Sequence, residues 1–232
     1  PGEIPEIWQN AIMDTNIHTV LFKNDTWEFS LPVIRLGTED RLELQFDDFR
    51  DNRLNLGYTL IHCDVEWKSS DLLPQEYLSG FGKGLISDIQ YSTNTAISYN
   101  HYRLVLPQED CTPIISGNYA LIVYDEEHPD DIILVQRLYV TENSITPEIR
   151  IKQPSYGIER ETSHQIFFSF DYNTREVHDP TSEFVAIAIQ NNRPDHILIF
   201  DKPYQAVSGR VEYTNPDNNI MEAGNEFRSI DL

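Results

Sequence analysis

The sequence predicts an all-β protein built from two immunoglobulin-like β-sandwich domains in tandem. Apolar residues alternate with polar ones at period two in many short runs, which is the pattern of half-buried strands. They almost nowhere recur at helical spacing over three turns. Clusters of Asn, Asp, Pro and Gly separate the runs, and these residues favour turns over regular structure.

The first predicted domain covers residues 1–143 and contains seven candidate strands, a number typical of a sandwich. The polar stretch 141–147 ends at Pro147, which cannot continue a central strand, and we place the domain boundary there. Residues 144–232 form the second predicted domain. The candidate strands of the first domain are 18–23, 27–31, 41–46, 58–67, 97–106, 119–124 and 132–140, and those of the second are 166–172, 185–189, 197–200, 211–213 and 226–230.

The strand predicted over 58–67 places Cys63 and Trp67 on the face that points into the sandwich. His62 and Asp64 fall on the opposite face, so His62, Cys63 and Asp64 cannot converge into one metal or nucleophile site. We therefore expect Cys63 to be a buried core residue.

The segment that opens the strand 119–124 resembles a tyrosine corner. Gly117 and Asn118 precede Tyr119, whose ring should be buried while its hydroxyl bonds the chain upstream. Leu121 stands where antibody domains carry their second core cysteine. Farther upstream, the segment 71–82 allows one helical turn, with Asp71 as a capping residue.

The charge of the chain restricts its partners. Lys and Arg number 17 against 38 Asp and Glu, giving a formal net charge of -21. No basic cluster suits a phosphate backbone, so nucleic acid is excluded as a partner. The same charge repels an anionic membrane surface, and no apolar run approaches the roughly eighteen residues of a membrane span, so we expect no direct membrane insertion.

Common catalytic motifs are missing: the sequence has no Walker loop, dinucleotide-binding turn, His-Glu-x-x-His pair or Gly-x-Ser-x-Gly elbow. Acidic neighbours occur at 47–48, 125–127 and 130–131, and we interpret them as solvated hairpin turns in preference to calcium loops. Cys63 and Cys111 either form a disulfide, worth about 4 kcal/mol on a chain-entropy estimate, or remain free. We expect no cofactor and no metal site.

A set of short motifs, read in order from residue 40 to 232, resembles the type IX secretion system plug protein family. Its members carry His-Cys-Asp-x-x-Trp, Ser-Gly-Asn-Tyr and similar strings. The residues that match are His62, Cys63, Asp64, Trp67, Asn94, His101, Tyr102, Gly117, Asn118, Tyr119, Gln190, Asn191, Asn225, Glu226 and Arg228.

The resemblance implies a non-enzymatic periplasmic protein that closes the pore of a large outer-membrane β-barrel translocon. It implies no catalytic residue and no cofactor, and it gives the motif residues structural roles in turns and strand ends. We expect a monomer whose signal peptide has been removed. Because the family continues with further β-structure, we also expect the second domain to be truncated at Leu232.

Two other classes of function stay open from the residues alone. A cell-surface carbohydrate-binding module would use exposed aromatics, for which the candidates near strand ends or in loops are Trp8, Trp27, Tyr77, Phe81 and Tyr91. A hydrolase would need two carboxylates that converge in a cleft, and no pair is selected by the sequence.

Overall fold

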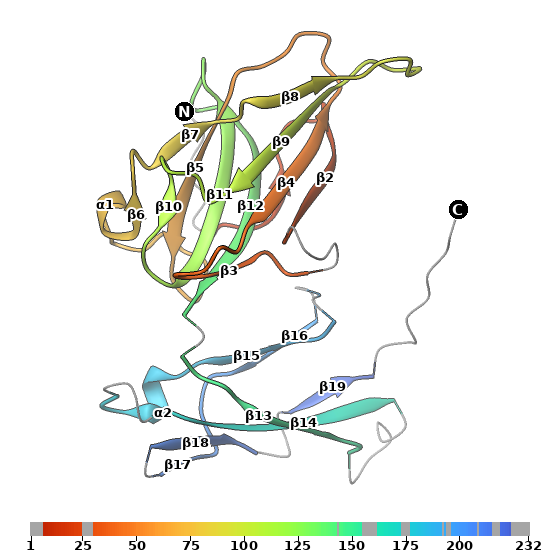
Figure 1. The fold of residues 1–232 in the computed structure, drawn as a ribbon. Helices are drawn as coiled ribbons and strands as arrows, with labels where there is room; N and C mark the ends of the chain where they lie inside the picture. The colour runs from red at the N-terminus through yellow and green to blue at the C-terminus, as the bar shows by residue number, and fades with distance from the viewer. Residues whose placement is uncertain are drawn as a thin grey trace. The chain divides into compact units, whose positions relative to one another are not determined.

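The structure is a computed structural model, and it describes residues 7–24, 30–142, 144–154, 162–172, 177–191, 193, 196–207, 209–214 and 219–223. The chain divides into two compact units, Pro1–Glu142 and Asn143–Leu232 (Figure 1). This division lies one residue from the boundary expected from the sequence. The prediction of an all-β fold is confirmed: within the described ranges the helices are α1 (Pro74–Tyr77) and α2 (Pro180–Glu183), four residues each.

The first unit is a sandwich of two sheets, which Figure 1 shows stacked on each other. The larger sheet has the order β1-β12-β11-β5-β7, with β3 paired in parallel to β12. The smaller sheet has the order β2-β4-β9-β8 and is antiparallel throughout. The bounds are β1 (Ala11–Ile12), β2 (Ile17–Asn24), β3 (Val33–Arg35), β4 (Leu42–Asp48), β5 (Leu56–Cys63), β7 (Lys83–Leu85), β8 (Asp88–Tyr91), β9 (Asn100–Leu106), β11 (Gly117–Asp125) and β12 (Ile132–Thr141); a separate pair is β6 (Leu78–Ser79) with β10 (Thr112–Pro113).

Strict alternation in the smaller sheet builds the central core. Every second residue of β4 and of β9 is buried, and these side chains meet those of the larger sheet. Because the period of a strand is two, one face of each strand is apolar and the other is left to solvent. The core includes Leu42, Leu44, Phe46, Tyr102, Leu104 and Leu106 from the smaller sheet and Tyr58, Leu60, Tyr119, Leu121 and Val123 from the larger one.

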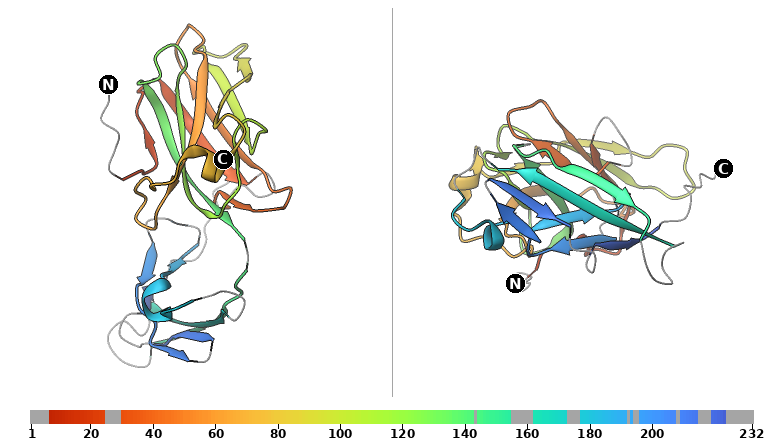
Figure 2. Two further views of the ribbon diagram at one scale, coloured as in Figure 1. Left: turned by 90° about the vertical axis from the view of Figure 1, so that its left-hand side faces the viewer. Right: turned by 90° about the horizontal axis from the view of Figure 1, so that it is seen from below.

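The outer face of the larger sheet is also partly covered, by the N-terminal segment. Figure 2 shows the red N-terminal strand, β1, beside the green strands, in agreement with its pairing to β12. Trp8 is only 2% exposed and packs on Cys63, Ala120 and Ile122. Its indole Nε1 donates to Ser69 Oγ at 2.9 Å. This cover explains why β11 is buried on both faces over most of its length.

The strand predictions for the first unit are largely confirmed. The runs 18–23, 41–46, 97–106, 119–124 and 132–140 correspond to β2, β4, β9, β11 and β12. Of the predicted strand 27–31, residues 27–29 lie outside the described residues, and Ser30 and Leu31 are irregular. The prediction of a strand over 58–67 is wrong at its end, because β5 stops at Cys63 and a turn follows.

The short helix predicted within 71–82 is confirmed as α1, but its cap is Leu73 and not Asp71. The carboxylate of Glu76 accepts a hydrogen bond from the backbone N–H of Leu73 at 2.7 Å. Pro74 occupies the first helical turn, where its missing N–H costs nothing. The local sequence thus supplies a helix start and one side-chain cap, from the Glu76 carboxylate to the Leu73 N–H.

The second unit has one sheet of order β13-β14-β18-β17, with β19 beside β14, and a separate hairpin β15-β16. Phe170, Phe200, Val211 and Tyr213 form its buried core. The runs 166–172, 185–189, 197–200 and 211–213 are confirmed as strands, while 226–230 lies outside the described residues. The bounds are β13 (Glu148–Lys152), β14 (Ser163–Asp171), β15 (Ala186–Ile189), β16 (Ile197–Phe200), β17 (Gln205–Val207), β18 (Arg210–Tyr213) and β19 (Ile220–Glu222).

Candidate functional site

His62 and Cys63 point to opposite faces of β5, as predicted. His62 faces the central core, with its Nδ1 2.9 Å from Ser70 Oγ and its ring edge-on to Tyr119 at 5.1 Å. Cys63 is 2% exposed, but it lies on the outer face of the larger sheet under Trp8 and not inside the sandwich as predicted. The N-terminal segment covers that face, and the local pattern of β5 contains no information about this cover.

Asp64 and Trp67 belong to the turn after β5. Asp64 Oδ1 accepts from the backbone N–H of Glu66 and of Lys68, both at 2.9 Å, which ends the strand in an Asx-type turn. Trp67 adopts a φ of 67°, and the guanidinium of Arg137 lies 4.2 Å from the centre of its ring. The prediction that Trp67 points inward from a strand is therefore wrong.

The tyrosine corner is confirmed. Tyr119 is fully buried, and its hydroxyl donates to the carbonyl of Ile115 at 2.9 Å. Gly117 is packed so closely against His62 that a Cβ atom at this position would collide with the imidazole. Asn118 donates from Nδ2 to the carbonyl of Asp64 at 2.9 Å, joining β11 to the turn after β5.

The motif residues of the smaller sheet make contacts inside the fold. His101 Nδ1 lies 2.7 Å from Asp47 Oδ1 on the neighbouring strand. Tyr102 is fully buried, and its hydroxyl both accepts from the N–H and donates to the carbonyl of Leu54, each at 3.0 Å. Asn94 sits in a loop with a φ of 58°, a backbone conformation that Asn tolerates.

In the second unit, Gln190 Nε2 donates to the carbonyl of Glu222 at 2.8 Å. Asn191 follows in a turn with a φ of 51°. Asn225, Glu226 and Arg228 lie outside the described residues. The contacts of the described motif residues are thus internal ones that hold turns and strand ends.

Two cysteines remain as free thiols. Cys63 and Cys111 are both buried and unbridged, and they belong to core clusters on different faces of the larger sheet. Burial raises the pKa of each thiol to about 11. Neither sulfur therefore has the lowered pKa and exposed setting of a reactive cysteine.

The acidic pair Asp47 and Asp48 does not form a solvated turn, as the sequence suggested, but ends β4. Asp48 is fully buried and pairs with Arg50 Nε at 2.9 Å, and Arg50 Nη1 reaches Asp14 Oδ2 at 2.9 Å. The pair therefore serves to anchor the loop after β4. Among the residues that the structure describes, no group of three or more His, Cys, Asp or Glu side chains could hold a metal ion.

A groove of about 420 Å³ lies on the outer face of the larger sheet of the first unit. It lies beside the part of the sheet that Trp8 covers. Its floor comes from β5, β11 and β12 and its wall from the segment around α1 and β7. The lining is largely apolar: Trp8, Ile61, Pro74, Tyr77, Phe81, Ile122, Tyr124, Pro129 and Ile132, with Thr59, Gly82, Lys83 and Glu126.

Phe81 stands at the edge of this groove and is 86% exposed. Gly80 and Gly82 on either side have φ values of 91° and 73°. The Gly82 N–H donates to the carbonyl of Asp110 at 2.8 Å, and the hydroxyl of Thr59 donates to the carbonyl of Gly82 at 2.7 Å. The turn is thus held on both sides, and it presents a large apolar ring to solvent.

The turn between β11 and β12 supplies an acidic side chain to the groove, that of Glu126. Glu126, Glu127, Asp130 and Asp131 are exposed in the turn between β11 and β12. Burial, together with the neighbouring Glu126 carboxylate, raises the pKa of Tyr124. The turn predicted for these residues is confirmed.

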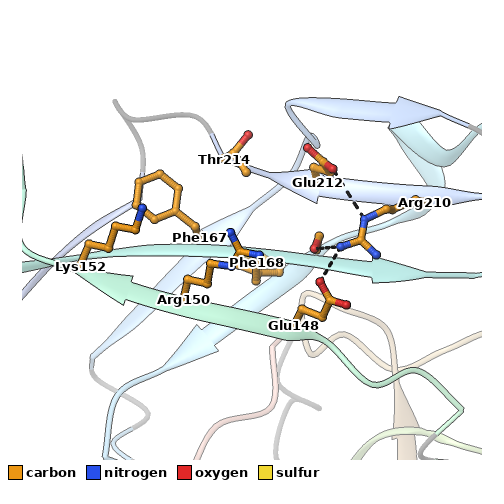
Figure 3. A pocket seen from close by; sticks show the side chains of 9 residues that line it. Glu148, Arg150, Lys152, Phe167, Phe168, Arg210, Glu212 and Thr214 are labelled. Carbon is orange, nitrogen blue, oxygen red and sulfur yellow. Dashed lines mark hydrogen bonds and ion pairs between the residues drawn. The ribbon is translucent and has the colours of Figure 1, made fainter.

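The second unit carries a smaller basin of about 210 Å³ on the sheet face formed by β13, β14 and β18 (Figure 3). Arg210 makes ion pairs with Glu148 at 2.7 Å and Asp171 at 3.2 Å. The ammonium of Lys152 lies 5.6 Å from the centre of the Phe167 ring. Because its acidic and basic groups largely neutralise each other, the basin does not define the charge of a ligand.

The aromatics proposed for sugar binding do not form a row. Trp8 and Tyr77 are buried in the cores, and Trp27 lies outside the described residues. Phe81 and Tyr91 are exposed, but Phe81 lies in the turn before β7 and Tyr91 lies at the end of β8 in the smaller sheet. Within the described part of the chain, no helix is long and apolar enough to cross a membrane.

The fold and its surfaces define a β-sandwich protein with an apolar groove on its larger sheet. More than half of the chain, residues 17–142, matches the model of the type 9 secretion system plug protein first domain, and the chain belongs to that family. It is not a family of enzymes, and membership associates the chain with type IX secretion at the cell envelope. No match was found among curated proteins.

Among solved structures, the chain is similar to a crystal structure of a hypothetical protein from Parabacteroides merdae ATCC 43184. The TM-score is 0.86 at 30% sequence identity, and the match covers 96% of this chain but 56% of that one. The chain thus spans little more than half the length of this relative. Pseudomonas fluorescens alkylpurine DNA glycosylase AlkC matches 54% of this chain and 30% of its own at 12% identity, but its TM-score of 0.31 carries no argument.

Proposed function

We propose that the protein is a non-enzymatic periplasmic plug that occludes the pore of the large outer-membrane β-barrel translocon of the type IX secretion system. The observation that carries the proposal is the family match over the first unit. Occlusion requires a rigid body with a complementary surface and no reacting group. A two-sheet sandwich with a core packed on both faces of its larger sheet suits such a body.

A plug must also leave the pore when a substrate passes. Its interface is therefore expected to be moderate in area, with a polar rim and a few strong contacts in place of a continuous apolar seam. The net charge of -21 would draw the protein to basic segments at the pore mouth and would oppose self-association, which favours a monomer.

The proposal predicts an open pore when the protein is missing. Deleting its gene in the native host should sensitise cells to vancomycin, which is too large for ordinary porins, and the full-length protein supplied in trans should restore resistance. Tagged full-length protein should capture a very large β-barrel subunit in near-stoichiometric amount from detergent-solubilised outer membranes. Unchanged permeability together with repeated failure to capture the barrel, while the protein is folded and exported, would refute the proposal.

A further inference from the structure

We infer that the groove edged by Phe81 binds an extended segment of a partner protein in which an apolar anchor is flanked by Lys or Arg. The inference concerns this surface alone, and it holds whether or not the protein closes a pore.

The groove is an apolar part of the sheet that the chain itself leaves open. Trp8 covers Cys63 and Ala120 on the same face of the larger sheet. Ile61 and Ile132 pack against this cluster but are only partly buried, and they line the groove. A volume of about 420 Å³ lies within the range of about 300–1,000 Å³ that small-ligand sites occupy. One or two large apolar side chains fit a space of this size.

Phe81 has the character of a binding hot spot. Exposed aromatic rings lose little entropy when they are bound, provided that the backbone holds them in place. Here the backbone is held, because a Cβ atom on Gly80 would lie 2.5 Å from the carbonyl oxygen of Glu109. The fold thus fixes the turn tightly against its neighbour while the ring has no cover of its own.

The negative charge beside the groove favours basic residues on either side of the partner's apolar anchor. Glu126 lines the groove, and the exposed carboxylates of Glu127, Asp130 and Asp131 belong to the same turn. The basic residue that lines the groove is Lys83. An apolar anchor would therefore pack on the floor of the groove while a neighbouring Lys or Arg pairs with the acidic turn. Acidic residues beside the anchor would be repelled by that turn.

The test uses three capped octapeptides titrated into the ¹⁵N-labelled full chain and followed by NMR. The first, acetyl-Lys-Arg-Gly-Phe-Leu-Gly-Arg-Lys-amide, is expected to shift the amide signals of the groove and its rim. A second peptide replaces the basic residues by Glu and Asp, and a third replaces Phe-Leu by Ser-Ser. Each of these two should bind at least about tenfold more weakly than the first, and 0.5 M NaCl should weaken the first at least about fivefold.

Two pairs of variants test whether the first peptide binds at the groove. Phe81→Ala should weaken the first peptide at least about tenfold, whereas Tyr91→Ala, which removes an exposed aromatic of the other sheet, should leave the affinity unchanged. Glu127→Lys should lower both the affinity and its salt dependence. Glu39→Lys, at an exposed position near the far end of β12, is the matched charge control.

Several outcomes would overturn the inference. These are no shift at 1 mM of the first peptide, equal binding of the charge-reversed peptide, or normal binding by a folded Phe81→Ala variant. Shifts of the groove signals by chitohexaose but not by the peptide would assign the surface to sugars and would also refute the inference.

Discussion

Neighbouring residues of one strand can have unrelated environments, and His62 and Cys63 illustrate this at the scale of single side chains. His62 packs between Ser70 and Tyr119 on the core side, while Cys63 is sealed under Trp8 on the outer side. A histidine beside a cysteine suggests a metal or nucleophile site, but the two side chains lie on opposite faces of the sheet and cannot act together. The raised pKa of Cys63, about 11, follows from the same burial.

The buried thiols lead to a residue-scale prediction. At pH 7.5, iodoacetamide should leave both Cys63 and Cys111 unmodified in the folded protein, because a thiol with a pKa near 11 has almost no thiolate at that pH. In 8 M urea both should be alkylated, giving two mass increments by intact-protein mass spectrometry. Rapid alkylation of folded protein would contradict this account.

The thiols also give a pH dependence of stability. Burial raises each folded-state pKa above 9.0, the ordinary value of a thiol, so unfolded chains lose thiol protons first as the pH rises. Stability that is fully present below pH 9 should therefore decline between about pH 9 and pH 11. Replacing both cysteines by Ala removes this contribution and should make the decline of the urea midpoint less steep over that window, while buried tyrosines such as Tyr58 and Tyr119, whose pKa values burial also raises, keep part of the decline.

At the scale of elements, one tyrosine ties the start of β11 to the segment before it. Tyr119 is held by its ring in the core and by its hydroxyl on the Ile115 carbonyl. Tyr119→Phe keeps the ring and removes the hydrogen bond, and it should cost about 1 kcal/mol or more of unfolding free energy, since a buried carbonyl loses a donor. Urea denaturation measures the loss, with Tyr91→Phe on an exposed ring as the control.

The turn that carries Phe81 gives a second element-scale prediction, on glycine. Gly37 and Gly80 both have positive φ, but a Cβ atom would meet nothing within 4 Å at Gly37 and would strike the backbone of Glu109 and Asp110 at Gly80. Gly37→Ala should cost about 1 kcal/mol from conformation alone. Gly80→Ala should cost clearly more in urea denaturation, and equal losses would mean that the turn is not tightly packed.

The whole molecule consists of two units with separate cores. The clusters around Tyr119 and around Trp8 are built from residues of the first unit, and the cluster around Phe170 is built from the second. Each unit therefore has its own source of hydrophobic stabilisation. The high negative charge belongs to the chain as a whole and affects partner encounter more than it affects the fold.

Separate cores predict that the first unit folds alone. A fragment of residues 1–142 should unfold cooperatively in urea, and its NMR amide signals should overlay those of the same residues in the full chain. A fragment of residues 1–130 is the control, because it lacks β12, which pairs with β1, β3 and β11, and it should not fold. A disordered 1–142 fragment would show that the first unit depends on the second.

The amino-acid sequence alone predicts the all-β class, most strand positions, the tyrosine corner and the family resemblance. These depend on short-range patterns: period-two alternation, turn residues and ordered motifs. Its errors arose where a side chain overrode the local pattern, as when Asp64 ended β5 in a turn by binding two backbone N–H groups.

Three features became known from the folded structure: which face of β5 contains Cys63, that the two thiols lie apart, and that Phe81 borders a groove. Each of these depends on residues distant in sequence. Trp8 packs against Cys63, and the residues that line the groove are spread along the chain from Trp8 to Ile132. Period-two alternation predicts that a strand has two different faces. It does not predict which segments will cover each face, because those segments are distant in sequence and come together only when the chain folds.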